Sequence, residues 1–324
     1  MTIKNLIINI ALGIFALCLF WGGLELLCRF RYNPAKHVYG GIFEYDKDKV
    51  YRLKKNLSNE KFAGRVCNTN SFGYRDREIP VEKGSSEKRI LVVGDSVTFG
   101  HGVLSEETYP ERLEILLSQR YPKFSFNVIN TAVPGNSPFQ EYYDLRRGLI
   151  FNPDVVVIQF DLNDLFEPYN VFKRYGGKGV DYHMVADVPY LHHVLSERSA
   201  LYLCLRSLAK KIRFAFEKKS VIREKAIKRE ILLSWNAAAD EPSDKKIRGA
   251  WDECLKWMQR EVDLCKREHK ACVLLVSPVK FQFFDDTRVY SQKVLKEFAA
   301  RNTIAYVDLL VDLRENARKE IIAA

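Results

Sequence analysis

The strongest constraint on the fold is an alternation of short apolar segments with amphipathic ones along two parts of the chain. The apolar segments, such as "RILVVGD" and "ACVLLVSP", have the length and the Val, Ile and Leu content of buried strands. The amphipathic segments carry apolar residues three and four positions apart, as one face of a helix requires. Strands that alternate with helices indicate an α/β fold, in which a parallel sheet is covered by helices on both faces. We expect strands at 89–95, 126–133, 153–164, 271–278 and 304–310, and helices at 108–121, 138–150, 250–269 and 290–302.

The alternation stops between Asp164 and about Ala250, so the predicted core is interrupted by an insertion. A basic segment with helical spacing of its apolar residues, at 199–235, lies in this interval. The dense Lys and Arg of 170–235 predict that the insertion lies over the carboxyl end of the sheet or against anionic lipid headgroups. The predicted units are a membrane helix at 5–28, an N-terminal extension at 29–85, a core formed by 86–165 and 266–324, and a helical insertion at 166–265.

The N-terminus carries an apolar run from Leu6 to Phe30 in which Glu25 is the only charged residue before Arg29. The run is longer than the roughly 20 residues that a helix needs to cross a bilayer. We therefore predict a retained single-pass membrane anchor. A cleaved signal peptide is the alternative, but "WGGLELLCRF" lacks the small-residue cleavage site that such a peptide needs.

The charges beside the apolar run point the main domain toward the cytoplasm. Lys4 flanks one side, whereas Arg29, Arg31 and Lys36 flank the other, and the positive-inside rule places the richer side in the cytoplasm. Long domains cross membranes regardless of such charges, so the sequence leaves the orientation open.

Composition limits the classes of partner and of metal site. With 51 Lys and Arg against 41 Asp and Glu, the net charge is +10, and we interpret the excess as a solvated basic face rather than a nucleic-acid site. None of the seven cysteines forms a C-x-x-C pair, so the sequence predicts neither a zinc ribbon nor a thioredoxin-type motif. Five cysteines follow the apolar run, an odd number, and we expect buried free thiols. No metal or organic cofactor is expected.

Polar residues and glycines follow three of the predicted strands. Ser96 follows the first strand, Gly135 the second and Asn163 ends the third. Ligands bind at the carboxyl ends of parallel strands, so the three should converge. A serine hydroxyl there is a candidate nucleophile, and the backbone N–H groups of Ser96 and Gly135 with the Asn163 amide are candidate donors to an oxyanion.

These segments resemble the blocks of the SGNH, or GDSL, hydrolase family. "GDSVTFGHG" is similar to the block that carries the nucleophile, here Ser96; "NTAVPGNSP" and "QFDLND" are similar to those that carry Gly135 and Asn163. The resemblance implies a three-layer, flavodoxin-like sandwich, an oxyanion hole formed by these residues, and ester substrates. "NSFGYRDRE" resembles a segment of membrane-anchored bacterial-type members, which favours an extracytoplasmic domain. Asp161 stands where many members have glycine.

The fourth family block, Asp-x-x-His, has no counterpart, so no histidine or aspartate of a catalytic triad is identifiable. The chain ends "VDLLVDLRENARKEIIAA", and its six histidines lie elsewhere, at 37, 101, 183, 192, 193 and 269. A serine hydroxyl without a base is a poor nucleophile at neutral pH. We interpret the core as C-terminally incomplete; a non-catalytic relative, or an enzyme that borrows a base, remain the alternatives.

Two functions follow from this interpretation. The first is a membrane-anchored serine esterase or acyltransferase that acts on a carbohydrate O-acetyl group or a lipid ester. The second is a catalytically inactive binding or scaffold protein on a hydrolase fold. A nucleotide-binding function is disfavoured, because "GDSVTFGHG" matches neither G-x-x-x-x-G-K-[ST] nor G-x-G-x-x-G.

Overall fold

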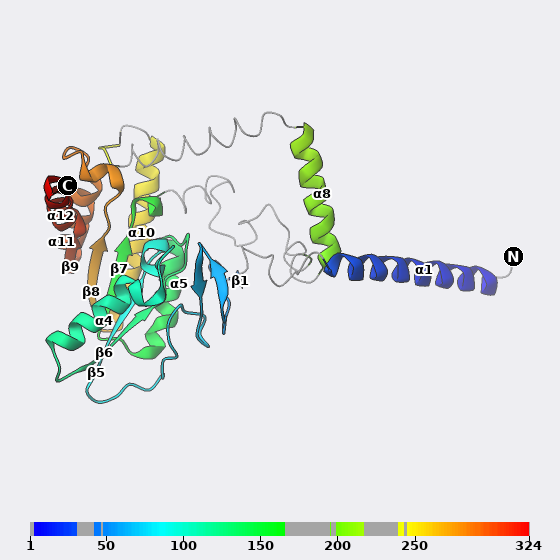
Figure 1. Ribbon diagram of the computed structural model, residues 1–324, viewed down its shortest axis with the longest axis horizontal. Helices are drawn as coiled ribbons and strands as arrows, with labels where there is room; N and C mark the ends of the chain where they lie inside the picture. The colour runs from blue at the N-terminus through cyan, green and yellow to red at the C-terminus, as the bar shows by residue number, and fades with distance from the viewer. Residues whose placement is uncertain are drawn as a thin grey trace.

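A five-stranded parallel sheet forms the centre of the protein, as the alternation predicts (Figure 1). The computed structural model describes residues 3–30, 42–46, 48–165, 195, 199–216, 239–242 and 245–323. The strand order is β6-β5-β7-β8-β9, so the chain reverses its direction of travel across the sheet between β5 and β7. Ligands bind at such a switch point. The strands are β5 (Glu87–Val93), β6 (Ser125–Asn130), β7 (Val155–Phe160), β8 (Ala271–Val276) and β9 (Ala305–Asp308).

Helices cover both faces of the sheet, because successive strand residues point to opposite sides. Leu91 and Val93 belong to a large apolar cluster that includes residues of three helices, whereas Val92 packs with Tyr109 and Leu113 of a fourth. The three helices on the first face are α5 (Pro138–Gly148), α10 (Lys245–Arg267) and α11 (Tyr290–Asn302), and the helix on the second face is α4 (Tyr109–Arg120). The predicted three-layer α/β fold is therefore confirmed.

Helix α10 belongs to the core rather than to an insertion. The predicted domain limits placed residues up to 265 in the insertion, but α10 packs against α5 and β8. Its apolar side buries Trp251, Met258 and Val262 in the large cluster of the first face. The core therefore resumes at Lys245, because this amphipathic helix is the crossover that leads into β8.

The C-terminal segment of the structure is helical, which the sequence pattern did not predict. The strand expected at 304–310 ends at Asp308, and α12 (Leu309–Ala323) begins at the next residue. The Asp308 carboxylate accepts a hydrogen bond from the Leu310 N–H at 2.9 Å. This is the contact of a helix N-cap, and it explains why the strand stops there.

Two small hairpins precede the sheet, in the extension for which the sequence showed no periodicity. They are formed by β1 (Phe43–Asp46) with β2 (Val50–Leu53), and by β3 (Glu60–Phe62) with β4 (Arg65–Cys67). Residues 68–79, which follow β4, form no strand. Phe43 and Leu53 form an apolar cluster with Phe99 and Val133, so the hairpins pack beside the loops at the carboxyl end of the sheet.

The N-terminal apolar run forms the long helix α1 (Ile3–Arg29), which projects away from the sheet (Figure 1). Residues 8–29 are long and apolar enough to cross a membrane, with a mean hydropathy of 2.1, a property that a signal sequence shares. A second helix, α8 (Ala200–Phe216), packs against α1. Most of the predicted insertion outside α8 and α10, including His183, His192 and His193, lies outside the described residues, as does His37.

All seven cysteines are free thiols. Of the five expected to be buried, Cys67, Cys254, Cys265 and Cys272 are buried and Cys204 is only half-buried.

Candidate active site

Ser96 opens a single helical turn, α3 (Ser96–Phe99), directly after β5. Asp95 caps this turn, since its Oδ1 accepts a hydrogen bond from the Val97 N–H at 2.8 Å. The turn ends at Gly100, whose φ of +83° lies in the left-handed region that glycine tolerates. A side chain at Gly94 would place its Cβ 2.4 Å from the Thr98 Oγ1. The glycine therefore allows the turn to fold closely over the strand end.

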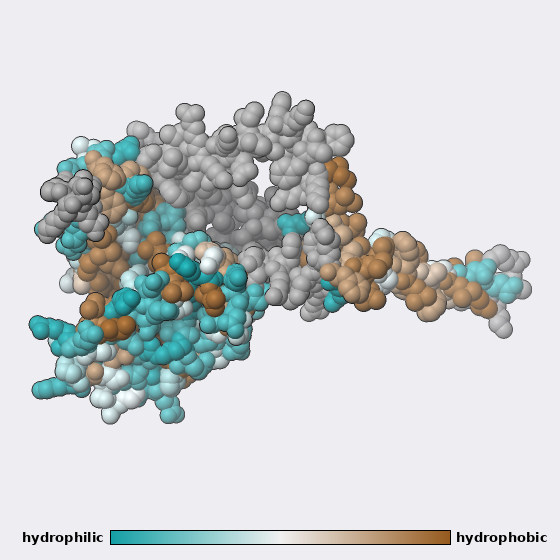
Figure 2. Space-filling model, in the orientation of Figure 1, coloured by the Kyte–Doolittle hydropathy of each residue, from teal (hydrophilic) through white to brown (hydrophobic). Residues whose placement is uncertain are grey.

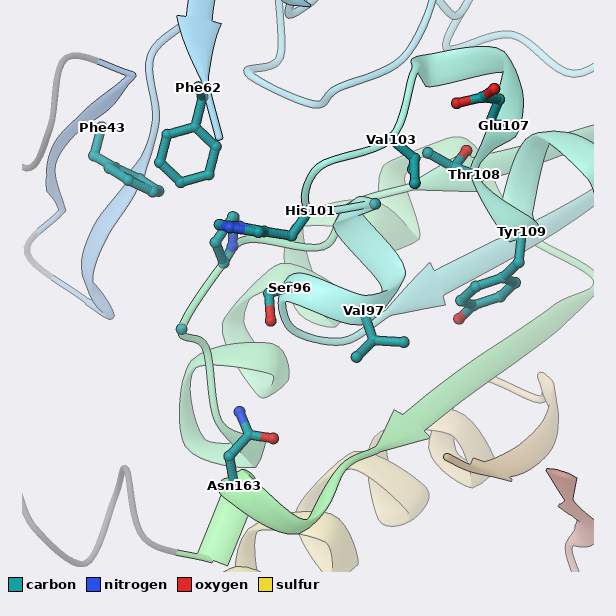
Figure 3. A pocket seen from close by; sticks show the side chains of 13 residues that line it. Phe43, Phe62, Ser96, Val97, His101, Val103, Glu107, Thr108, Tyr109 and Asn163 are labelled. Atoms are coloured by element: carbon teal, nitrogen blue, oxygen red, sulfur yellow. The ribbon is translucent and has the colours of Figure 1, made fainter. Parts of the chain in front are cut away.

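Ser96 and Asn163 meet at one carboxylate oxygen. The Ser96 Oγ donates to the Asp95 Oδ2 at 3.2 Å, and the Asn163 Nδ2 donates to the same oxygen at 2.8 Å. Asn163 lies in η4 (Leu162–Leu165), a 3-10 turn that follows β7. Figure 3 shows the two side chains approaching each other from neighbouring strand ends. An amide has two N–H groups, so Asn163 retains a donor for the cleft.

Gly135 lies in the loop that follows β6, and it lines the same cleft as Ser96 and Asn163. Its φ is +79°, so a residue with a side chain would be strained there. The expected convergence of the three candidate residues is therefore observed. Their catalytic roles stay predictions.

The hairpin β1–β2 holds the Gly135 loop from outside. The Tyr51 hydroxyl donates to the Pro134 carbonyl at 3.1 Å. The Asn136 side chain donates to the Asp144 Oδ2 at 2.7 Å, and the buried Lys49 ammonium forms an ion pair with the same carboxylate. Lys49 comes from the turn of the hairpin and Asp144 from α5, so the extension is bonded to the helix that follows the glycine loop.

The cleft in front of Ser96 is open and has a volume of about 810 Å³. Phe43 and Phe62 from the two hairpins form one wall (Figure 3). The ring of His101 packs edge-on against Phe62, with 5.3 Å between ring centroids. The sequence did not indicate that the extension contributes to the site; the remaining lining residues are Val97, Gly100, Val103, Glu107, Thr108, Tyr109 and Pro134.

Several buried acids lie near the strand ends. Burial, with the nearby Asp95, raises the pKa of Asp161 to about 7. Burial also raises the pKa values of Glu141, Asp164 and Glu261 well above their usual range, with repulsion between neighbouring acids adding to the effect. Burial therefore favours the protonated form of each of these three carboxyls.

No imidazole bonds to Ser96 within the ranges that the structure describes. His101 lines the cleft, but the contact recorded with Ser96 is from the His101 backbone N–H to the Ser96 carbonyl, at 3.0 Å. His269 lies in the turn that leads into β8, at the amino end of that strand. The hydroxyl of Ser96 therefore has a carboxylate partner, Asp95, where a serine hydrolase needs a base.

No group of three or more His, Cys, Asp or Glu residues among the described positions is arranged to hold a metal ion.

Comparison with known proteins places residues 92–321 in a match with the GDSL-like Lipase/Acylhydrolase family. The solved structures that resemble the chain include AlinE4, an SGNH-hydrolase family esterase, with 14% identity, a TM-score of 0.37, and coverage of 70% of this chain and 77% of that one. A catalytic mutant of Axe2, an acetylxylan esterase from Geobacillus stearothermophilus, has 17% identity and a TM-score of 0.39 over 71% of this chain and 80% of that one. No curated protein matches the chain.

Proposed function

Because the chain belongs to the GDSL-like lipase/acylhydrolase family, we propose that it cleaves or transfers an acyl ester with the Ser96 hydroxyl as nucleophile. One observation carries this proposal. Ser96, Gly135 and Asn163 come from three different strand ends and line a single cleft. Such a meeting of a hydroxyl with amide donors is the arrangement that acyl transfer requires.

In the proposed reaction, the Ser96 Oγ attacks the ester carbonyl and the carbonyl oxygen becomes an oxyanion. The backbone N–H groups of Ser96 and Gly135 and the Asn163 amide stabilise that charge. One such donor contributes about 2.7 to 4 kcal/mol in serine hydrolases. Collapse of the intermediate expels the alcohol, which takes up the proton released by the Ser96 hydroxyl, and leaves an acyl group on Ser96. Water or a second hydroxyl then removes this acyl group.

The proposed substrate is a carbohydrate O-acetyl ester or a lipid ester. The cleft wall that faces Ser96 is largely apolar and includes the two aromatic rings of Phe43 and Phe62. Aromatic and aliphatic walls favour an acyl chain or the apolar face of a sugar over a charged substrate.

Helix α1 is the proposed single-pass membrane anchor of the enzyme. Its apolar residues are exposed along its length, and the 22 residues from Ile8 to Arg29 are enough to span a bilayer core. Alkaline carbonate extraction without detergent tests this proposal: the full-length chain should stay in the membrane pellet. Release into the supernatant, or an N-terminus cleaved after the apolar run, would contradict it.

A catalytically inactive binding protein is the second candidate. It is favoured by the hydrogen bond from the Ser96 Oγ to Asp95, together with the lack of an imidazole bonded to Ser96 among the described residues. A serine without a base loses up to about a millionfold in kcat, although the oxyanion hole and binding alone leave about a thousandfold over water.

Hydrolysis of p-nitrophenyl acetate by the full-length chain in detergent separates the two candidates. The expected result is slow turnover that Ser96→Ala abolishes and the matched control Ser277→Ala, at the end of β8, leaves unchanged. Fast turnover that depends on Ser96 would show that a base acts, and His183, His192 and His193 would be the first residues to replace. Equal rates in the wild type and Ser96→Ala would favour the binding protein.

A further inference from the structure

The single acidic residue of the apolar helix α1, Glu25, has specific partners in the structure. Its carboxylate accepts hydrogen bonds from the Ser199 hydroxyl at 2.8 Å and from the backbone N–H groups of Ala200 and Leu201 at 2.9 Å each. Arg29, one turn further along α1, donates to the same carboxylate at 2.9 Å. The first N–H groups of a helix have no partner within that helix. Glu25 therefore caps the start of α8.

A second contact lies beside this cap. The thiol of Cys28 in α1 lies near the thiol of Cys204 in α8. Cys28 lies three residues after Glu25, and Cys204 lies four residues after Ala200. The Glu25–Ala200 contact and the Cys28–Cys204 contact are therefore about one turn apart on each helix. The two helices therefore share an interface that begins at the end of α1.

The opposite side of α8 exposes a row of large apolar side chains. Leu205, Leu208 and Ile212 are 51%, 54% and 51% exposed, and their spacing of three and four residues places them on one face of the helix. Ala200 and Leu203, on the other side, are buried. We name Leu205, Leu208 and Ile212 the α8 stripe. In Figure 2 the apolar surface of α8 is continuous with that of α1.

We propose that α8 is a membrane-contacting helix, held by Glu25 against the end of the anchor, with the α8 stripe inserted into the lipid interface. We choose lipid as the occupant because the start of α8 contacts the end of the apolar segment of α1 that is long enough to cross a membrane. The charge of α8 also favours an anionic membrane surface, since its sequence contains basic residues and no acidic ones. An amphipathic basic helix binds anionic membrane surfaces by burying its apolar face. This inference rests on the proposed anchor, and it places a second contact between the enzyme and its membrane.

Photocrosslinking in vesicles tests the proposed occupant. The full-length chain carries p-benzoylphenylalanine at position 208, and the vesicles contain phosphatidylcholine, phosphatidylglycerol and an alkyne-tagged phosphatidylcholine. Position 17 in α1 is the positive control and position 66, an exposed valine in β4, the negative control. We expect lipid adducts at 208 comparable with those at 17 and about tenfold above those at 66.

Each outcome decides the inference. Lipid adducts at 17 but none at 208, or adducts from 208 to protein, would overturn it while leaving the anchor in place. Lipid adducts at neither position would overturn the anchor and this inference together. The Ser96-dependent ester assay is independent of both results, so a failure here is distinct from a failure of the proposed chemistry.

The Glu25 cap is tested by oxidation of the two thiols. Diamide, which takes up the two protons and two electrons released by a thiol pair, should join Cys28 to Cys204 in membranes, as read by peptide mapping. Glu25→Ala should lower the yield several-fold, because the cap is lost. Glu25→Gln, which keeps an acceptor oxygen, should restore most of it. An equal yield in all three proteins would show that Glu25 does not hold α8.

Discussion

The ends of strands β5, β6 and β7 differ from the ends of β8 and β9 in what their polar side chains do. After the first three strands, Ser96, Gly135 and Asn163 line the cleft. After the last two, the side chains complete the fold: the Ser277 hydroxyl accepts a hydrogen bond from Gln159 at 3.2 Å, and Asp308 caps α12. No described residue of β8, β9 or α12 lines the cleft.

A serine hydrolase needs both a nucleophile with oxyanion donors and a base, and the two ends of the sheet differ in which of these they can supply. The nucleophile and the oxyanion donors need only the neighbouring ends of β6, β5 and β7, which meet at the switch point. A base must reach the same hydroxyl from another segment, and the described residues after β8 and β9 supply none. The proposed oxyanion site therefore lies in a region where no described residue is placed to take the proton of Ser96.

The largest expected effect is at Lys49, whose ion pair with Asp144 supports the loop that carries Gly135. Lys49→Met leaves the buried Asp144 carboxylate without its ion-pair partner. Removing one partner of a buried pair costs about 3 to 5 kcal/mol of unfolding free energy. Chemical denaturation followed by tryptophan fluorescence measures this loss. The double variant Lys49→Met with Asp144→Asn should recover much of it, and a single variant as stable as the wild type would refute a supporting role.

Asn163 is expected to matter for reactivity rather than for stability. Asn163→Ala should lower the rate constant for phosphonylation of Ser96 by a fluorophosphonate about a hundredfold, because one oxyanion donor is lost. Intact-protein mass measures the rate. Asn302→Ala, which removes an amide outside the cleft, should leave the rate unchanged. Equal rates in both variants would remove Asn163 from the oxyanion site.

Asp161 tests the electrostatics of the β7 end. Its pKa is raised to about 7 in the folded chain, so the native state holds a proton that the unfolded chain loses near pH 4. Stability should therefore fall as the pH rises from about 4 through 7. Asp161→Asn should be more stable than the wild type by about 1 to 3 kcal/mol at pH 8, since one pKa unit corresponds to about 1.4 kcal/mol, and little different at pH 4.

Asp154 provides a control of opposite sign for that measurement. Its hydrogen bonds, chiefly those from Lys83 and the Arg89 backbone, outweigh burial and lower its pKa, so it stabilises the fold above pH 4. Asp154→Asn should therefore lose stability at pH 8 relative to pH 4. If both variants changed in the same direction with pH, the burial of Asp161 would not be the cause.

The sequence predicted the sheet and the meeting of its strand ends, but not the walls of the cleft. Runs such as "ILVV" and "VVVI" leave little choice other than buried parallel strands, and Ser96 and Asn163 lie a few residues after such runs. The segment with Lys49 has no periodicity, because its three-residue turn and four-residue strands are too short to show one. Its contacts with α5 and Pro134 form across about 90 residues of chain, so no local pattern reveals them.

The smallest expected effect is at the end of β9, which does not line the cleft. Asp308→Ala should remove the cap of α12 and lower the unfolding free energy by about 1 kcal/mol. The rate of Ser96 phosphonylation should not change, because Asp308 does not line the cleft. A loss of reactivity with Asp308→Ala would mean that the end of β9 takes part in the site after all.

Addition of a base is the most direct test of the claim that the ends of β5, β6 and β7 form an oxyanion site in need of one. The chain would be extended after Ala324 with the Asp-x-x-His segment of an active family member, and kcat/KM for p-nitrophenyl acetate compared with that of the unextended chain. We predict a rise of about a hundredfold or more, as general-base catalysis provides, and its complete loss in Ser96→Ala. A folded extended chain with no gain, or a gain that survives Ser96→Ala, would contradict the account.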